Sequence, residues 1–453
     1  MAAHLAVVVL AAGKGTRMRS TLPKVLHRLG GRTILEQVLH NLKGLAHQHC
    51  VVVVGYGADR VRAQIDRPDI AFVEQTEQLG TGHAVQQVMP LLMDFSGHVL
   101  VLNGDAPLIR PGTLERLVTT HVQSGAEATI LTARLADPTG YGRVFLDSEG
   151  QVLQVIEHRD CTPEQRLNTL INAGIYCYRW ERLAEVLPAL KADNDQSELY
   201  LPDTLLQLAN VAQVEVDDPT EVLGINDRLQ LAEASRVLNT RTLERLMRAG
   251  VTIVDPASVT VDDTVEVEAD VIIEPQTHLR GQTRIAAGCR IGPGTLIEDS
   301  LLDTEATVLY SVLHGARVGA LSRIGPYAHL RSESVIGKGC RIGNFVEVKK
   351  ASVGDGSAAA HLSYLGDATL GERVNIGAGT IIANYDGKHK HHTRLGDAVK
   401  TGANSVLVAP LSLGDGVNVA AGSTVTEDVS QGLVIARPRQ VVKPEWRPSY
   451  ESS

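Results

Sequence analysis

The feature that most restricts the fold of this chain is an aliphatic residue that recurs at every sixth position after Gly250. A six-residue period does not match the 3.6-residue turn of an α-helix, but it fits a parallel β-helix in which one aliphatic side chain points inward from each side of the coil. The sequence therefore predicts a β-helix of hexapeptide repeats over residues 250–453. The repeat follows five registers: Ile253, Val259, Val265 and Val271; Ile273, Leu279, Ile285, Ile291 and Ile297; Val312, Val318, Ile324, Leu330, Ile336, Ile342 and Val348; Leu370, Ile376 and Ile382; Leu407, Leu413, Val419 and Val425.

Breaks in this register predict loops, and loops on a regular scaffold are where function usually lies. The longest break is ANYDGKHKHHTR, residues 383–394. Its KHKHH run (388–392) contains the nitrogen ligands of a metal site, but it also alternates them with lysines. We therefore expect a solvated polar loop here and no metal.

The first half of the chain has a different pattern. Short apolar runs at 5–10, 51–54, 98–102 and 128–133 alternate with helix-like spacing at 34–45 and 113–123. This alternation predicts an α/β domain over residues 1–225, with a mixed, mostly parallel, Rossmann-like sheet whose ligands bind at the carboxyl ends of the strands. Residues 226–249 read as one helical linker, and Gly250 follows as a C-cap.

Composition excludes several classes of function. A net charge of −9 is unsuited to a protein that mainly binds nucleic acid. No apolar stretch approaches the roughly 20 residues of a membrane span, and the run at 5–10 is too short for a signal peptide. The five cysteines are scattered without a CxxC pair, which predicts reduced, buried thiols and no zinc site. We therefore expect a cytoplasmic enzyme without membrane or nucleic-acid partners.

A glycine-rich loop, LAAGKGTRM (10–18), follows the first expected strand. Its small residues allow a backbone to approach a phosphate closely, and Arg17 and Lys24 supply the cations that triphosphate chemistry needs. The loop lacks both the Walker A pattern and the third glycine of a dinucleotide fingerprint, and GxG alone is also consistent with a tight turn. Asp105 follows the expected strand at 98–102, where it either faces a ligand or forms a turn. Asn226 is equally consistent with an N-cap of the helix that follows.

The string GxGTRM followed by Pro23-Lys24 resembles the signature of sugar-nucleotide pyrophosphorylases. Companion motifs occur at EQLGTGHA (77–84), NGDAPL (103–108), DPTGYGR (137–143), IEHRD (156–160), INAGIY (171–176) and GINDR (224–228). Together with the repeats, they resemble the bacterial bifunctional N-acetylglucosamine-1-phosphate uridyltransferase/glucosamine-1-phosphate acetyltransferase family from about residue 5 to 440. That resemblance implies a left-handed β-helix and an enzyme that makes UDP-N-acetylglucosamine for peptidoglycan and the cell wall.

The resemblance implies roles for residues of the first domain. The uridine nucleotide would be held by Leu10, Ala11, Ala12, Gly13, Lys24, Gln75, Gly80, Thr81, Asn103, Gly104 and Asp105. The sugar phosphate would meet Gly142, Glu157, Asn172 and Asn226, while Asp105 and Asn226 would bind Mg²⁺, a hard cation that prefers oxygen ligands. Arg17 and Lys24 would neutralise charge as the sugar 1-phosphate displaces pyrophosphate from UTP.

For the second domain, the resemblance implies that His361 is the base that accepts a proton from the amine of glucosamine 1-phosphate. A lone histidine is more often structural, but His361 lies in a break of the repeat, within HLSYLGD. The sugar phosphate would be bound by Arg331, Lys349, Tyr364 and Asn375, and acetyl-CoA by Ala378, Asn384, Tyr385, Ala403, Ala421 and Arg437. Arg439 competes with Arg437 for the coenzyme A phosphates. The resemblance also implies a homotrimer.

Two alternatives stay open at the level of sequence. One is a nucleotidyltransferase with a single activity, in which the β-helix only regulates or oligomerises. The other is a sugar-nucleotide sensor that has lost catalysis. His361 and the NYDG loop argue against the first, and the intact set of Arg17, Lys24, Asp105 and Asn226 argues against the second.

Overall fold

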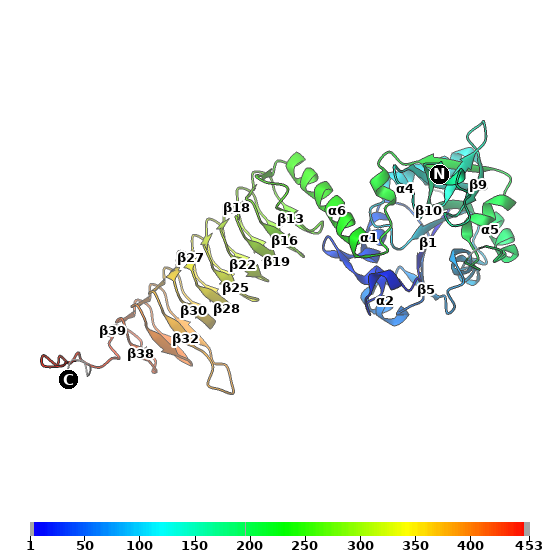
Figure 1. The fold of residues 1–453 in the computed structure, drawn as a ribbon. Coiled ribbons are helices and arrows are strands. Elements are labelled where there is room, and N and C mark those ends of the chain that lie inside the picture. The colour runs from blue at the N-terminus through cyan, green and yellow to red at the C-terminus, as the bar shows by residue number, and fades with distance from the viewer. Residues whose placement is uncertain (1–3, 195, 448–453) are drawn as a thin grey trace. The chain divides into compact units, whose positions relative to one another are not determined.

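The computed structural model describes residues 4–194 and 196–447, and the chain forms two compact units that divide between Leu238 and Asn239 (Figure 1). Each unit has its own hydrophobic core. Within the described residues, no helix is both long enough and apolar enough to cross a membrane.

The first unit is built on a mixed sheet in the order β11-β7-β10-β6-β1-β4-β5. Four strands match the predicted runs: β1 (Leu5–Ala11), β4 (His49–Val54), β6 (His98–Asn103) and β7 (Ala128–Arg134). The sheet also contains β5 (Ala71–Glu74), β8 (Arg143–Leu146), β9 (Val152–Ile156), β10 (Leu170–Arg179) and β11 (Val211–Glu215), and β2 (Arg28–Leu29) pairs with β3 (Arg32–Thr33) outside it. Strand β1 pairs in parallel with β4 and β6, β4 with β5, and β11 with β7, whereas β10 runs antiparallel to β6 and β7. The prediction of a mixed, mostly parallel sheet is therefore confirmed.

Helices cover both faces of this sheet, because alternate residues of its central strands are buried on opposite sides. Leu5, Val7 and Val9 pack with α1 (Ile34–Asn41), α2 (Ala58–Gln64) and α4 (Pro111–Ser124). Ala6 and Val8 pack with α3 (Thr81–Gln86) and α5 (Trp180–Val186). Helix α1 begins at a capping box between Thr33 and Glu36 and ends four residues before the predicted Leu45. Short 3-10 turns complete the unit: Thr16–Met18, Lys24–Leu26, Met89–Leu92, Gln165–Leu167, Leu187–Ala189, Leu201–Gln207 and Pro219–Val222.

Helix α6 (Arg228–Arg248) occupies most of the segment predicted as a linker. Its first half buries Ala234 and Leu238 in the first unit, and its second half contributes Leu243 and Leu246 to the core of the second. The division of the chain at 225 and 249 stays a prediction.

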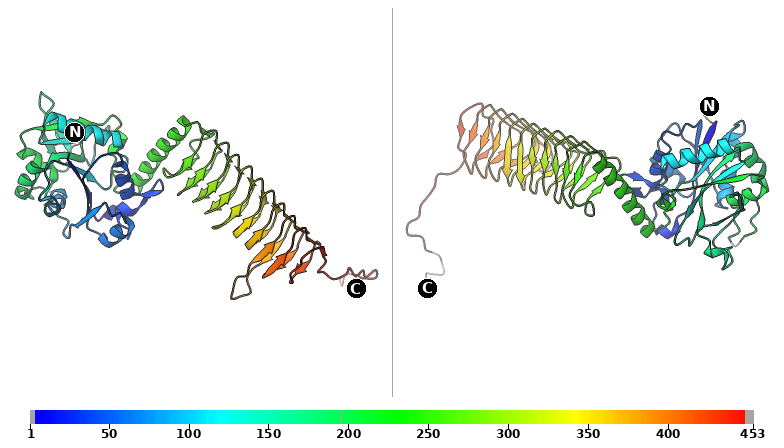
Figure 2. Two further views of the ribbon diagram at one scale, coloured as in Figure 1. Left: turned by 180° about the vertical axis from the view of Figure 1, so that it is seen from behind. Right: turned by 90° about the horizontal axis from the view of Figure 1, so that it is seen from above.

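The second unit is a parallel β-helix, whose short strands stack as successive rungs (Figures 1 and 2). One face consists of β12 (Thr252–Ile253), β15 (Ile272–Ile273), β18 (Arg290–Ile291), β21 (Thr307–Val308), β24 (Arg323–Ile324), β27 (Arg341–Asn344), β29 (Ala358–His361), β31 (Asn375–Ile376), β34 (Lys400–Thr401), β37 (Asn418–Val419) and β39 (Leu433–Val434). The next consists of β13 (Thr260–Val261), β16 (His278–Arg280), β19 (Leu296–Glu298), β22 (Val312–His314), β25 (His329–Leu330), β32 (Ile381–Ala383), β35 (Val406–Val408) and β38 (Thr424–Val425). The third consists of β14 (Glu266–Val267), β17 (Arg284–Ile285), β20 (Leu301–Leu302), β23 (Arg317–Val318), β26 (Val335–Ile336), β33 (Thr393–Leu395) and β36 (Leu411–Leu413), and the longer β28 (Glu347–Val353) and β30 (Tyr364–Leu370) turn from the second face onto the third.

The predicted repeat points inward with one exception. Val312 is only half-buried, and its neighbour Leu313 is the core residue, so the prediction was wrong at this position. The reason is that the inward residue advances by five positions, not six, from Leu313 to Val318. A tighter corner therefore accounts for this break in the register, without an inserted loop.

Candidate active sites

The glycine-rich loop after β1 forms one wall of a cavity of about 350 Å³ in the first unit. Its lining contains ten of the eleven residues predicted to hold the nucleotide: Leu10, Ala11, Ala12, Gly13, Lys24, Gln75, Gly80, Thr81, Asn103 and Asp105. The eleventh, Gly104, donates its N–H to the carbonyl of Leu10 at 2.9 Å. A Cβ at Gly104 would lie 2.9 Å from the same oxygen, so a larger residue would separate the strands that form the cavity.

Gly15 fixes the position of Lys24. It has a left-handed backbone conformation with φ of 59°, and a Cβ there would lie 2.6 Å from the Cβ of Lys24. Only glycine satisfies both requirements without displacing the lysine. The structure therefore explains why the second position of the GxG motif is a glycine.

The ammonium of Lys24 joins the two predicted magnesium ligands. It forms an ion pair with Asp105 and donates a hydrogen bond to Oδ1 of Asn226 at 3.2 Å. A carboxylate oxygen and an amide oxygen thus converge on one positive charge. Among the described residues, no group of three or more His, Cys, Asp or Glu side chains is arranged to hold a metal. Two protein oxygens suit Mg²⁺, which commonly completes its coordination with phosphates and water.

A second cavity of about 300 Å³ adjoins the first, and the two share Leu10, Thr81, Asn103 and Asp105. Its lining contains Arg17 and all four residues predicted to meet the sugar phosphate: Gly142, Glu157, Asn172 and Asn226. Asn172 lies at a bulge of β10, where its side-chain amide donates to the hydroxyl of Tyr176 at 2.7 Å. The sequence therefore predicted residues that the fold brings together in adjoining cavities.

Burial changes the acidity of two groups in the second cavity. It raises the pKa of Glu157, and the nearby carboxylates of Asp160 and Asp203 raise it further. Burial also raises the pKa of Tyr141, a residue that was not predicted to have a role although it lies within the DPTGYGR motif. Glu198, which lines the first cavity, was missed as well, since its surroundings in the sequence contain no distinctive motif.

In the second unit, His361 ends β29 and its side chain is exposed at a corner of the β-helix. The backbone carbonyl of His361 accepts a hydrogen bond from the N–H of Gly379 on the next rung, at 3.4 Å. The pattern continues along the β-helix: the carbonyl of Ala378 accepts the N–H of Asn404 at 2.7 Å, and the carbonyl of Ala403 accepts the N–H of Gly422 at 2.8 Å. His361, Ala378, Ala403 and Ala421 therefore lie on successive rungs of one corner. We call this line of residues the His361 corner.

The remaining residues predicted to bind acetyl-CoA lie around this corner or on the loop after β32. The Cδ atom of Arg437 lies 3.9 Å from the position that a Cβ on Gly422 would take, which places Arg437 beside Ala421. Asn384 is buried and donates to Asp367 and, at 3.5 Å, to the hydroxyl of Tyr364. Tyr385 is exposed. Asn375 pairs with Ala358, three residues before His361 on the neighbouring rung.

A cluster of positive charge lies on the neighbouring face. Arg331 pairs with Glu347 at 2.9 Å. The close approach of the Lys390 ammonium lowers the pKa of Lys349, and the charge of Arg331 lowers it further. Lys390 was not predicted to belong to the site, because the KHKHH run was interpreted only as a solvated loop. Its alternating lysines were the available signal, and the cluster is suited to a phosphate.

The upstream part of the His361 corner carries large exposed side chains. These side chains are Tyr310, Tyr327, Phe345 and Leu362, and 44–60% of each residue is exposed. All four have φ between 46° and 60°, a left-handed conformation that is unfavourable for bulky residues. Ring centroids are 5.7 Å apart between Tyr310 and Tyr327, and 5.5 Å apart between Tyr327 and Phe345. We call these four residues the apolar ladder.

The first unit is an α/β domain with a glycine-rich loop and polar residues that converge on Lys24. The second is a hexapeptide β-helix with an exposed histidine. Together they define a two-domain transferase. Residues 7–199 match the MobA-like NTP transferase domain, and residues 315–350 match the bacterial transferase hexapeptide of six repeats. The chain is similar to the bifunctional protein GlmU of Gloeobacter violaceus (67% identity, covering 100% of this chain and 99% of the relative), of Acaryochloris marina (60%, covering 98% of each) and of Synechococcus elongatus (58%, covering 98% of each).

The chain belongs to the bifunctional GlmU family. It is a uridyltransferase and an acetyltransferase that makes UDP-N-acetylglucosamine. The predicted family, fold class and pair of activities are confirmed, and the alternative of a single activity is set aside.

Proposed function

We propose that Asp105 and Asn226 hold Mg²⁺ during uridylyl transfer from UTP to N-acetylglucosamine 1-phosphate. The observation that supports this proposal is the convergence of their oxygens on the Lys24 ammonium. When bound, Mg²⁺ supplies positive charge to the phosphates of UTP. Leu10 and the small residues from Ala11 to Gly13, with Gln75, Gly80, Thr81 and Asn103, surround the nucleotide in the first cavity. Gly104 supports this wall through its hydrogen bond to Leu10.

In this proposal, the second cavity holds the sugar phosphate against Gly142, Glu157 and Asn172. A phosphate oxygen of the sugar forms a bond to the α-phosphorus of UTP, and the bond to the leaving pyrophosphate breaks. The attacking phosphate is already a nucleophile, so no side chain has to remove a proton. Arg17 and Lys24 stabilise the charge that moves onto the pyrophosphate, and the two adjoining cavities align the reactants.

For acetyl transfer, we propose that His361 accepts the proton that the amine of glucosamine 1-phosphate loses as its nitrogen attacks the acetyl carbonyl. The carbon–sulfur bond then breaks, and the proton accepted by His361 passes to the sulfur, so that coenzyme A leaves as a thiol. Arg331, Lys349 and Lys390 bind the phosphate of the sugar, and Tyr364 and Asn375 contact the sugar ring. Acetyl-CoA follows the His361 corner along Ala378, Ala403 and Ala421, next to Asn384 and Tyr385, with Arg437 near its phosphates.

We further propose that the protein is a homotrimer and works in the cytoplasm. The apolar ladder supports self-association, because a second copy presents side chains with the same spacing along the β-helix. The five cysteines, which are all buried and unpaired, support a reducing compartment.

One preparation of the full-length enzyme tests the two chemical proposals. Release of free coenzyme A is measured with glucosamine 1-phosphate and acetyl-CoA, and release of pyrophosphate with N-acetylglucosamine 1-phosphate, a nucleoside triphosphate and Mg²⁺. We expect both products, with UTP preferred over the other nucleotides. Pyrophosphate release that persists after chelation of divalent cations would contradict the role of Asp105 and Asn226.

A further inference from the structure

The two proposed Mg²⁺ ligands are carried by different segments of the first unit. Asp105 lies just after β6, and Arg110 follows it by five residues, at the start of α4. Asn226 lies beyond β11, and Glu221 precedes it by five residues, in a 3-10 turn. The distance between the ligands therefore depends on how these two segments are joined.

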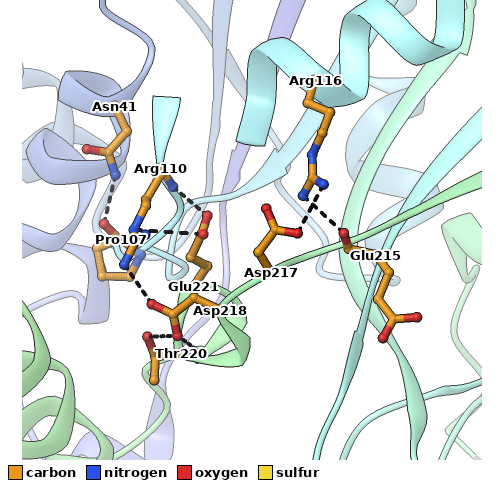
Figure 3. Close-up of polar contacts among 9 residues, drawn as sticks. All are labelled: Asn41, Pro107, Arg110, Arg116, Glu215, Asp217, Asp218, Thr220 and Glu221. Carbon is orange, nitrogen blue, oxygen red and sulfur yellow. Dashed lines mark hydrogen bonds and ion pairs between the residues drawn. The ribbon is translucent and has the colours of Figure 1, made fainter. Parts of the chain in front are cut away.

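The carboxylate of Glu221 is the buried contact among those that join the two segments. Glu221 is 2% exposed, and its carboxylate accepts the backbone N–H of Arg110 at 3.0 Å, with Nε of Arg110 at 3.8 Å (Figure 3). Burying a carboxylate costs free energy, and pairing recovers that cost only in part. Stability alone therefore gives a poor account of a charged group at this position.

Further contacts hold the two segments on either side of Glu221. Arg110 donates to Asp218 at 2.7 Å, and Asp218 caps the turn that contains Glu221 by accepting the N–H of Thr220 at 3.0 Å (Figure 3). Beyond the turn, the N–H of Ile225 donates to the carbonyl of Asp105 at 2.9 Å. Ile225, the residue before Asn226, is thus bonded directly to the backbone of Asp105.

The Asp105 segment is also held from its other side. Asn41 is buried on α1, and its side-chain amide donates to the carbonyl of Pro107 at 2.8 Å (Figure 3). The chain after Asp105 is therefore bonded to α1 on one side, and the Glu221 contact attaches the Asn226 segment to it on the other.

We propose that Glu221 is a positioning residue for uridylyl transfer: by binding the Arg110 backbone, it holds Asn226 at the distance from Asp105 that a shared divalent cation requires. This inference rests on the proposed metal role of Asp105 and Asn226. Glu221 acts through the backbone and does not touch substrate.

The test compares the full-length enzyme with Glu221→Ala and Glu221→Gln. In Glu221→Ala, we expect the Mg²⁺ concentration for half-maximal pyrophosphate release to rise about 10-fold, with recovery of the rate at high Mg²⁺. Binding of Mn²⁺ in the presence of UDP-N-acetylglucosamine, followed by the electron paramagnetic resonance signal of free Mn²⁺, should weaken by a similar factor. Glu221→Gln keeps an acceptor for the Arg110 N–H and should show a smaller shift in the same direction.

Asp217→Asn is the matched control, because Asp217 lies on the same segment and pairs with Arg116 at 3.2 Å, but its side chain is 86% exposed. It should retain the wild-type cation requirement, and release of coenzyme A should be unchanged in all three variants. An unchanged cation requirement together with unchanged Mn²⁺ binding in Glu221→Ala would overturn the inference. If the alanine variant does not fold, a wild-type cation requirement and wild-type Mn²⁺ binding in Glu221→Gln would overturn it. A wild-type enzyme that needs no divalent cation would instead refute the proposed metal role itself.

Discussion

The Nζ atom of Lys24 lies 3.2 Å from Oδ1 of Asn226, although 202 positions separate the two residues in the chain. The same ammonium pairs with Asp105, so one lysine connects the glycine-rich loop, the end of β6 and the start of the segment that leads into α6. These three segments form the centre of the proposed uridyltransferase site.

Lys24→Met should lower the rate of pyrophosphate release by about 100-fold or more, because a positive charge aimed at the phosphates would be lost. The methionine retains most of the aliphatic stem beside Gly15. Lys14→Met, in the same loop but with an exposed side chain, should retain its activity. Equal losses in the two variants would show that the loop tolerates no change and that Lys24 has no special role.

His361→Ala should lower acetyl transfer by about 100-fold or more, since a positioned base typically contributes at least this factor. Uridylyl transfer should continue at the wild-type rate, because its proposed residues all lie in the other unit. His278→Ala is a suitable comparison, because His278 lies on the same β-helix. Within the described residues, its ring is hydrogen-bonded to the hydroxyl of Thr260. Coenzyme A release near the wild-type rate in His361→Ala would exclude His361 as the base.

Lys390→Ala should raise the KM for glucosamine 1-phosphate by about 10-fold and change kcat less, because a bond to a charged phosphate oxygen is worth one to a few kcal/mol. The variant should also allow the pKa of Lys349 to rise, since Lys390 is the main cause of its depression. Lys388→Ala removes a charge from the same loop and serves as the control. If both variants have the wild-type KM, the phosphate does not bind at this cluster.

A buried histidine, His121, and its half-buried neighbour His98 should make the first unit less stable in acid. Burial lowers the pKa of His121 from 6.5 to about 3, and it also lowers the pKa of His98, whose ring lies 4.9 Å from that of His121. Between pH 6.5 and 3, the unfolded chain binds more protons at these positions than the folded unit does. The stability is therefore complete above about pH 6.5 and decreases as the pH falls, by at most about 1.4 kcal/mol per pH unit for each group.

The measurement is urea unfolding followed by the fluorescence of Trp180, which is buried in the first unit, in a Trp446→Phe background. The free energy of unfolding should decline from pH 7 to pH 5. His121→Phe should reduce that slope, and an identical slope in this variant would show that the acid sensitivity arises elsewhere.

Phe345→Glu should weaken self-association, because it places a charge in the middle of the apolar ladder. Light scattering should give the mass of a trimer for the wild type and a smaller mass for the variant. Leu321→Glu changes a residue of similar exposure that also has a positive φ, but lies at a different corner, and it should leave the mass unchanged. A trimeric Phe345→Glu enzyme would exclude the ladder as the contact between copies.

The sequence was most informative where a period or a motif had a single physical meaning. The recurrence of Ile324, Leu330 and Ile336 has no helical explanation, so the β-helix could be predicted with its inward residues. Likewise, β1 and β6 were recognisable as apolar runs, and parallel strands place the residues that follow them at one edge of the sheet. This is why Gly13 and Asp105 could be predicted to share a site.

Contacts that join distant segments had no such signal. Nothing in the neighbourhood of Glu221 indicates that its carboxylate would be buried against Arg110, and Lys390 became informative only when the fold placed it beside Lys349. The shift from Val312 to Leu313 was missed for a different reason. A repeat of five residues fits the coil nearly as well as one of six, so the spacing of aliphatic residues alone cannot locate a tighter corner.

The backbone bonds along the His361 corner restrict how such an enzyme can change in length during evolution. Each described rung near this corner pairs with the rungs above and below it, so a complete coil could be gained or lost upstream of Asn344 without altering the spacing from His361 to Ala421. A single-residue insertion within a strand would instead reverse which side chains face the interior. Drift in length is thus confined to whole coils and to their corners, and the histidine keeps its distance from the residues downstream.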